Sequence, residues 1–169
     1  MGLFNKHKKT TSAVKKEQKA KLSDYLAEKN IIFFNAGPSK RQVLGSLIAS
    51  LDLSDPNAAL QAILQREEKG STLIAPALAL PHARISGLTK IAAALAICPE
   101  GVVDPLAGHA VVKVFLLFLG PAEDMSLHLA FLANVSALFQ NDAFRETLLG
   151  LTKPSDVLKK IQETEKKLV

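Results

Sequence analysis

The sequence has little of several residue types that mark particular classes of protein. It contains one cysteine, Cys98, and no tryptophan, and only 5% of its 169 residues are aromatic. A single cysteine excludes an internal disulfide framework and is typical of a reducing compartment. The scarcity of aromatic residues argues against a stacking platform for single-stranded nucleic acid. Because Cys98 lies inside the apolar run IAAALAIC, we expect a small buried hydrophobic residue with no chemistry of its own.

Long apolar segments and targeting signals are also absent. No apolar run approaches the ~18 residues that a transmembrane helix needs. The start of the chain, MGLFNKHKKTTS, lacks the apolar core of a secretory signal, and Lys6 breaks the pattern for N-myristoylation. The sequence therefore predicts a soluble, cytoplasmic protein with no transmembrane segment.

Familiar site motifs are missing too. The chain has no glycine-rich phosphate loop, no G-x-S-x-G, no C-x-x-C and no H-E-x-x-H. A zinc site needs three or four ligands at suitable spacing, and four scattered histidines with one buried cysteine do not supply them. We therefore expect no metal and no other cofactor.

The positive charge of the chain is concentrated at one end. Residues 1–22 hold seven lysines and one glutamate, a net charge of +6, so the overall +5 leaves −1 for the rest. Such a segment is typically a solvated extension, flexible or helical, and only secondarily a nonspecific contact for nucleic acid or anionic lipid. We expect no specific nucleic-acid partner.

The remaining sequence has the patterning of one globular domain. The 48% hydrophobic and 22% charged residues of the whole chain are ordinary for a protein that buries a single core. Helical periodicity and turn residues predict helices over 21–30, 39–51, 54–70, 121–140, 141–151 and 155–168. Short apolar runs bounded by Gly and Pro predict strands over 31–35, 71–84, 90–98 and 110–120. The segment 99–110 is rich in turn residues and should hold a short exposed strand or a loop. We predict an α/β fold, a single domain with a small central mixed β-sheet flanked by helices, with a basic extension over 1–21 and the domain over 22–169.

The stretch ALALPHARI, residues 77–85, is the most informative candidate site. Pro81 should interrupt the strand ladder and expose His82 at the carboxyl end of the strand, where open α/β sheets hold their sites. A lone histidine there is more often structural, but Arg84 adds a fixed cation that suits phosphate or carboxylate. These residues favour a functional role for His82.

A second histidine, His128, lies in the first turn of the helix that we expect to be capped by Ser126. Free backbone amides at a helix start favour an anion, and we place His128 on the polar side of that turn. A structural role is equally open for His128 alone. If the two histidines meet, one neutral imidazole can act as a nucleophile while the other donates a hydrogen bond.

Several segments together resemble a known family. The span from about Ser39 to about Lys160 contains, in order, REEKGST, ALALPHAR, LAGHAVVKVFLLFLGPAEDMSLHLAFLANVSALF, NDAFRETLL and the closing SDVLKKI. Their order and distances resemble the enzyme IIA domain of the phosphoenolpyruvate-dependent sugar phosphotransferase system, in its mannitol/fructose and nitrogen-regulatory class. The resemblance covers about three quarters of the chain.

The resemblance implies a phosphoryl carrier. His82, in the P-H motif, would accept the phosphoryl group from the carrier HPr or its nitrogen-branch relative, on the nitrogen Nε2. His128 would be the second active-site histidine, and Arg66 matches an arginine that the family places near the phosphate. Arg84 stands where the family often has arginine. The group would then pass to a IIB permease domain or serve as a regulatory signal.

The chain also departs from the family pattern. Leu73, Ile74, Ala75, Pro76 and Ala77 replace a glycine-rich segment, and Ala83 replaces a common glycine. Because glycine permits dihedrals that alanine and proline do not, we expect a change in loop shape that affects partner fit more than chemistry. Two alternatives stay open: a regulatory binding module on this fold that controls a target protein without transfer, and a nucleic-acid-associated protein that uses the lysine-rich extension.

Overall fold

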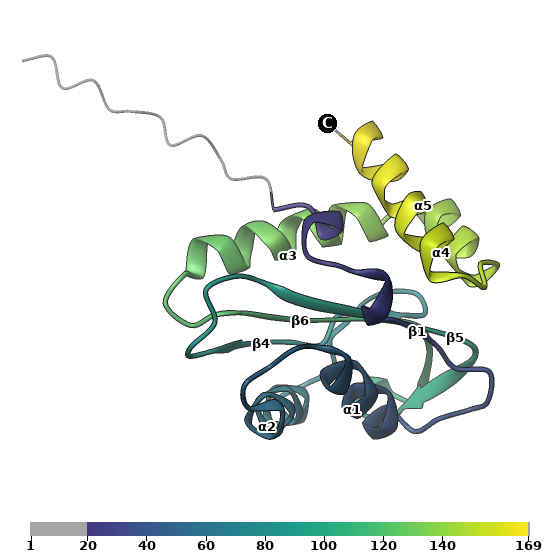
Figure 1. Ribbon diagram of the computed structural model, residues 1–169. Helices are drawn as coiled ribbons and strands as arrows, with labels where there is room; N and C mark the ends of the chain where they lie inside the picture. Colours follow the sequence, from purple (N-terminus) through teal and green to yellow (C-terminus); the bar gives the residue numbers. More distant parts are fainter. Residues whose placement is uncertain (1–19, 169) are drawn as a thin grey trace, which may run out of the picture.

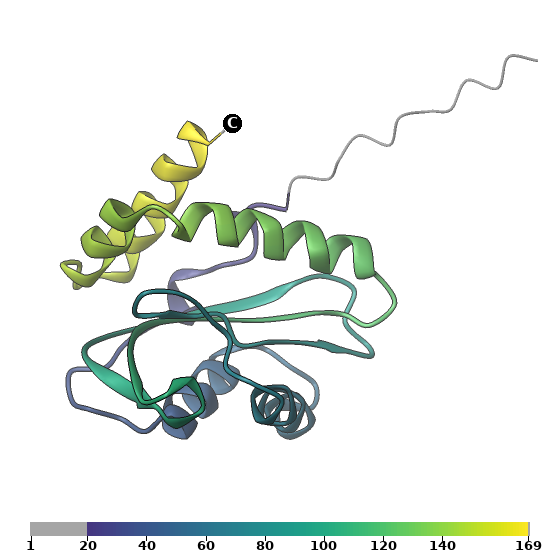
Figure 2. The same cartoon turned by 180° about the vertical axis from the view of Figure 1, so that it is seen from behind.

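A central sheet separates two layers of helices in the computed structural model, which describes residues 20–168 (Figure 1). Helices α1 (Lys40–Ser50) and α2 (Pro56–Glu68) cover one face. The other face is covered by α3 (Met125–Phe139), α4 (Asp142–Leu149) and α5 (Pro154–Lys167). Figure 2 shows the same two layers from behind. The predicted α/β domain, with a small central mixed sheet flanked by helices, is confirmed.

The sheet of residues 20–168 has six strands in a mixed arrangement. They are β1 (Ile31–Phe33), β2 (Leu73–Ala75), β3 (Leu78–Ala79), β4 (His82–Ile85), β5 (Ala92–Asp104) and β6 (Ala110–Pro121). The order is β1-β5-β6-β3-β2, and β4 also pairs with β6. The β5–β6 and β2–β3 pairs are antiparallel, whereas β1–β5, β3–β6 and β4–β6 are parallel. Strand β4 therefore has one free edge.

Strands β3 and β4 follow each other along β6 without losing register. Leu78 is paired with Val114, and four residues later His82 is paired with Phe118. Pro81 interrupts the strand because it has no N–H to donate, but its carbonyl accepts from Phe118 N–H at 3.0 Å. The proline thus breaks the strand while keeping His82 beside Phe118.

Strand β6 supplies side chains to the cores on both sides of the sheet. Leu116 and Phe118 pack with Phe131 beneath α3, whereas Phe115 and Leu117 pack beneath α1 and α2. Both sets are fully buried. A strand covered on both faces needs apolar side chains at every position, which explains the continuous run VFLLFL.

Capping residues define three of the predicted helix starts. Ser39 accepts from Gln42 N–H and the Gln42 side chain accepts from Ser39 N–H, which completes a capping box at α1. Asp55 caps α2 with Pro56 in its first turn, and Asn141 caps α4. These starts are confirmed.

Three local predictions are wrong. Residues 21–30 form two short 3-10 turns, η1 (Leu22–Asp24) and η2 (Glu28–Asn30), in place of one helix. The side chain of Asp124 caps α3 in place of Ser126, and Lys153 precedes α5 without a side-chain cap in place of Ser155. The turn-rich segment after Cys98 does hold a strand, one of the two predicted forms, because β5 continues to Asp104 and its Val102 and Val103 pair with β6. The turn itself is formed by η3 (Pro105–Ala107) and its flanks.

The predicted basic extension over 1–21 lies almost wholly outside the described residues, and the boundary at residue 22 stays a prediction. Packing of the domain already includes Ala20, which is buried and whose carbonyl accepts from the Asn134 side chain at 2.9 Å. Cys98 is 1% exposed, as predicted, and burial raises the pKa of its thiol to about 11. Within residues 20–168, no helix has the length and apolar character needed to cross a membrane.

Candidate functional site

His82 is the first residue of the edge strand β4, two residues after the fully buried Leu80. The prediction that it follows the end of a strand is wrong in this respect, because the chain resumes pairing with β6 directly at His82. Its position near the carboxyl end of β6 agrees with the expected location of a site. The strand pairing fixes where its Cα lies.

Two contacts orient the His82 ring. Its Nδ1 lies 2.7 Å from the Leu80 carbonyl oxygen, and the ring stacks on Phe118 with centroids 5.3 Å apart and planes 11° apart. A carbonyl can only accept, so this contact assigns a proton to Nδ1. In the neutral ring, Nε2 is then left with its lone pair. The arrangement prepares Nε2 to act as a nucleophile or a proton acceptor.

His128 lies at the start of α3 and is only 6% exposed. The prediction that His128 lies on the polar side of the first turn is wrong, because the side chain is buried. The Asp124 side chain caps the helix by accepting from Leu127 N–H at 3.0 Å, and the Asp124 carbonyl accepts from His128 N–H at 3.3 Å. The His128 amide is therefore used within the helix, and only its ring remains to act in the site.

The two predicted histidines meet. Their ring centroids are 5.6 Å apart with planes at 50°, and Phe118 contacts the His128 ring as well, at 5.0 Å. Burial lowers the pKa of His128 below its ordinary value, and the electrostatic effects of the neighbouring His82 and Arg84 lower it further. His128 is therefore a neutral imidazole at physiological pH.

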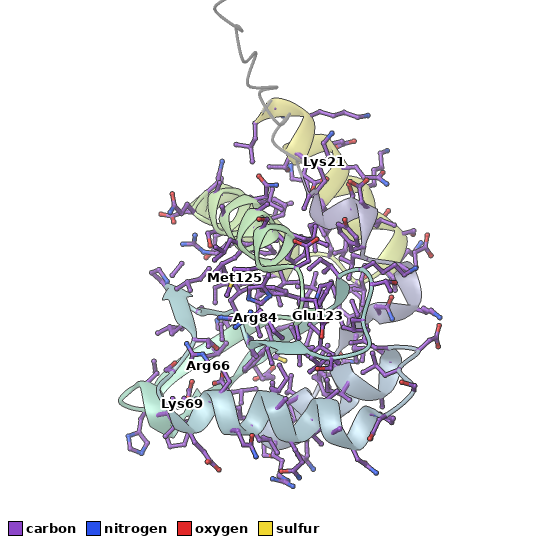
Figure 3. All side chains as sticks on the ribbon, turned by 90° about the vertical axis from the view of Figure 1, so that its left-hand side faces the viewer. Lys21, Arg66, Lys69, Arg84, Glu123 and Met125 are labelled. Atoms are coloured by element: carbon purple, nitrogen blue, oxygen red, sulfur yellow. The ribbon has the colours of Figure 1, made fainter. Side chains whose placement is uncertain are left out.

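A cleft of about 390 Å³ opens at the free edge of β4 and contains both histidines. Helix α2 supplies one wall, and the lining residues are Ala62, Gln65, Arg66, Lys69, His82, Ala83, Arg84 and His128. Figure 3 shows Arg66, Lys69 and Arg84 on this one side of the molecule. Arg66 Nη1 donates to the Gly70 carbonyl at 3.2 Å, and Arg84 Nη1 to the Ala122 carbonyl at 3.4 Å. All four predicted site residues thus line one cleft.

Lys69 also lines the cleft and was not predicted from the sequence. This lysine follows Arg66 by three residues, a spacing that places two side chains on the same helical face, and it directly follows the last residue of α2. This spacing from Arg66 is the feature of the sequence that indicates Lys69 as a neighbour in the same site. Three cations and a neutral imidazole around an unprotonated nitrogen suit an electrophile with negative charge.

A buried ion network supports the α2 wall from behind. Lys40 Nζ lies 2.6 Å from Glu67 Oε2 and 3.0 Å from Asp104 Oδ2, and the Asp104 side chain is fully buried. Ser71 donates to Asp104 at 3.1 Å, and Thr72 donates to Glu67 at 2.7 Å. The network joins the start of α1, the end of α2 and the end of β5. Because Glu67 directly follows Arg66, it also helps to fix the basic wall.

The same network determines the ionisation of Asp104. Burial alone would raise the pKa of this carboxyl. The hydrogen bonds from Lys40, Leu106 N–H and Ser71, together with the charge of Lys40, hold the pKa below its ordinary value instead. Asp104 is therefore a carboxylate in the folded protein.

The segment that replaces the family's glycines makes a tight turn. Pro76 and Ala77 connect β2 to β3, and Ala77 has a φ of 61°. Its carbonyl accepts from Lys113 N–H at 2.8 Å and Val114 N–H at 3.0 Å, which anchors the turn to β6. Alanine thus adopts a backbone conformation that favours glycine, at a conformational cost.

The chain combines an α/β/α arrangement with a histidine pair at a sheet edge. A comparison with protein families matches residues 24–164 to "Phosphoenolpyruvate-dependent sugar phosphotransferase system, EIIA 2". The chain belongs to this family. The resemblance found in the sequence is confirmed.

Individual relatives include both transport and regulatory proteins. The chain is 26% identical over 151 residues to a fructose-specific EIIABC component of Bacillus subtilis, with 86% of this chain and 24% of the relative covered. It is 30% identical over 131 residues to a nitrogen regulatory protein of Bradyrhizobium diazoefficiens, with 75% and 85% covered. The chain thus spans about a quarter of the length of the first relative and most of the second.

Solved structures share the fold. The nitrogen regulatory protein IIA-Ntr of Neisseria meningitidis matches with a TM-score of 0.73 and 22% identity, covering 82% of this chain and 97% of that one. A complex of mannitol enzyme IIA with phosphorylated enzyme IIB from Escherichia coli matches with a TM-score of 0.61 and 16% identity, covering 82% and 97%. At these identities the likeness establishes the architecture.

Proposed function

We propose that this domain carries a phosphoryl group on Nε2 of His82. The observation that carries the proposal is the 2.7 Å contact between His82 Nδ1 and the Leu80 carbonyl, which leaves Nε2 unprotonated in a cleft lined by Arg66, Lys69 and Arg84. Membership of the enzyme IIA family supports the same chemistry.

The phosphoryl transfer needs no reactant other than the donor phosphohistidine. The Nε2 lone pair of His82 attacks the phosphorus of a donor phosphohistidine, the donor P–N bond breaks, and its electron pair returns to the donor imidazole. The Nδ1–H bond to Leu80 stays in place and stabilises the positive charge that develops on the His82 ring. The reverse steps deliver the group to the next acceptor.

The other cleft residues act on the phosphoryl oxygens. Arg66, Lys69 and Arg84 spread their negative charge, and the neutral His128 ring donates a hydrogen bond. Its Nδ1 is buried without a hydrogen-bond partner, so a proton there would lose a hydrogen bond. The proton is therefore favoured on Nε2. The two histidines would thus carry opposite tautomers, one a nucleophile and the other a donor.

The partners follow from this chemistry and from the relatives. The donor is a small phosphohistidine carrier similar to HPr or to its nitrogen-branch homologue, and the acceptor is a IIB domain, as in the mannitol complex. Such carriers belong to the cytoplasm, where we place this domain. The nitrogen regulatory relative favours a second function, in which the domain controls a target protein by its phosphorylation state or by binding without transfer.

Intact-mass analysis after incubation with phosphoenolpyruvate, enzyme I and HPr, or its nitrogen-branch homologue, tests the proposal. We expect an acid-labile gain of about 80 Da that His82→Ala abolishes and His109→Ala retains, since His109 is exposed in the turn before β6. Absence of the gain with either carrier would refute phosphoryl carriage. Passage of the group to a IIB domain would support transport, and binding of a target without passage would support regulation.

A further inference from the structure

Gly120 lies in β6 directly beside the histidine pair. It is the register partner of Arg84, two residues beyond the pair formed by Phe118 and His82. Its backbone does not require glycine, because the positive-φ glycines of the described chain are Gly70, Gly87, Gly101 and Gly108. Another reason must account for the absence of a side chain at this position.

That reason is the His128 ring. A Cβ atom added to Gly120 would clash with Nδ1 of His128 and would lie 3.1 Å from its Cγ and 3.3 Å from its Cβ. All three atoms belong to one residue, and they include the start of its side chain, so a small rotation of a flexible tip cannot relieve the overlap. The imidazole occupies the space that a side chain at position 120 would need.

The buried ring has one open direction. His128 is 6% exposed, and Phe118 contacts its ring at 5.0 Å. On the Gly120 side its Nδ1 finds no hydrogen-bond partner. The His128 ring can move only toward the cleft that it lines together with His82. A displaced ring would therefore change its relation to His82.

We propose that Gly120 is a positioning residue for His128. Because Gly120 has no side chain, the imidazole of His128 can pack directly against β6. This packing sets the 5.6 Å separation between the ring centroids of His128 and His82, and it keeps Nδ1 against a surface that offers no hydrogen-bond acceptor. The consequence for phosphoryl transfer rests on the proposed function. The placement of His128 by Gly120 does not.

Gly120→Ala tests the proposal by two independent readouts. In histidine-labelled protein, ¹⁵N and ¹H NMR should show displaced His128 ring resonances and a changed His128 pKa, with no phosphoryl donor present. The rate of phosphoryl transfer to His82 should fall by about 100-fold, the effect of a displacement near 1 Å at a reacting centre. Gly45→Ala is the matched control, because nothing lies within 4 Å of a Cβ at Gly45.

The double variant Gly120→Ala/His128→Ala separates positioning from a general defect. Removing the imidazole vacates the space that the new methyl group needs, so the double variant should match His128→Ala in stability and in transfer rate. The comparison between the double variant and His128→Ala can be made even if Gly120→Ala alone fails to fold. Unchanged His128 resonances in a folded Gly120→Ala, or an additional loss in the double variant, would overturn the proposal. If His82 is never phosphorylated but the His128 resonances move, the proposed function fails while the positioning role stands.

Discussion

The His82 ring lies flat on Phe118, and the same two residues are partners in the parallel β4–β6 register. Phe118 is fully buried and contacts three aromatic rings, those of His82, His128 and Phe131. One core side chain therefore joins the hydrophobic core to both imidazoles. The orientation of the site depends on the packing beneath it.

Phe118→Leu should loosen both histidines. We expect a loss of about 1–2 kcal/mol in the free energy of unfolding, together with broadened or shifted ring resonances of His82 and His128. Phe139→Leu is the control, since Phe139 pairs with Phe144 at 5.2 Å in the same core. Urea unfolding and histidine NMR measure the two effects. Equal histidine shifts in both variants would contradict a specific role for Phe118.

His128 should make stability depend on pH. Its pKa is lower in the folded protein than the ordinary value of 6.5, so the unfolded chain binds more protons between these two values. The stabilising contribution is complete above pH 6.5 and is lost as the pH falls toward the folded pKa. Urea unfolding between pH 5 and pH 8 gives the free energy of unfolding at each pH. That free energy should change less with pH in His128→Gln than in the wild type. His109→Gln should keep the pH dependence of the wild type.

Asp104→Asn should destabilise the protein strongly. It keeps the side-chain shape but leaves Lys40 with one carboxylate, and breaking a buried ion pair costs about 3–5 kcal/mol. Lys40→Met/Glu67→Gln/Asp104→Asn removes all three charges together and should recover part of that loss, which chemical denaturation can measure. Asp52→Asn is the control, because Asp52 pairs with Lys29 on the surface. A similar loss for both single variants would argue against the network.

Acid should weaken the same network. Because the folded pKa of Asp104 is depressed, its contribution is present above the ordinary value of 3.8 and is lost as the pH falls below it. The difference in unfolding free energy between wild type and Asp104→Asn should therefore narrow in acid. A constant difference down to low pH would exclude ionised Asp104 as its source.

Ala77→Gly should stabilise the protein by about 1 kcal/mol, because glycine adopts a φ of 61° without steric cost. Ala58→Gly provides the opposite case, since Ala58 is exposed in α2, and glycine there should cost about 1 kcal/mol. Thermal unfolding compares the two. A destabilised Ala77→Gly would show that the turn relieves its strain elsewhere.

Local chemistry made much of this protein predictable from its sequence. Ser39, Asp55 and Asn141 mark helix starts because a cap acts on residues only a few positions away. The run VFLLFL identifies a strand that is buried on both faces, and the P-H motif indicates His82 as the proposed phosphoryl acceptor. Around Ser126 the prediction was wrong because a neighbouring residue, Asp124, offers a competing polar cap. Over 21–30 it was wrong because packing decides between a helix and short turns.

The long-range relations were decided by the tertiary structure. Phe118 lies 36 residues beyond His82, and Asp104 lies 64 residues beyond Lys40. No periodicity encodes such pairings, because strand register and layer packing depend on the whole chain. The burial of His128, the inclusion of Lys69 in the cleft and the space at Gly120 follow from that packing. The sequence thus determined which residues can do the chemistry, and the fold determined which of them meet.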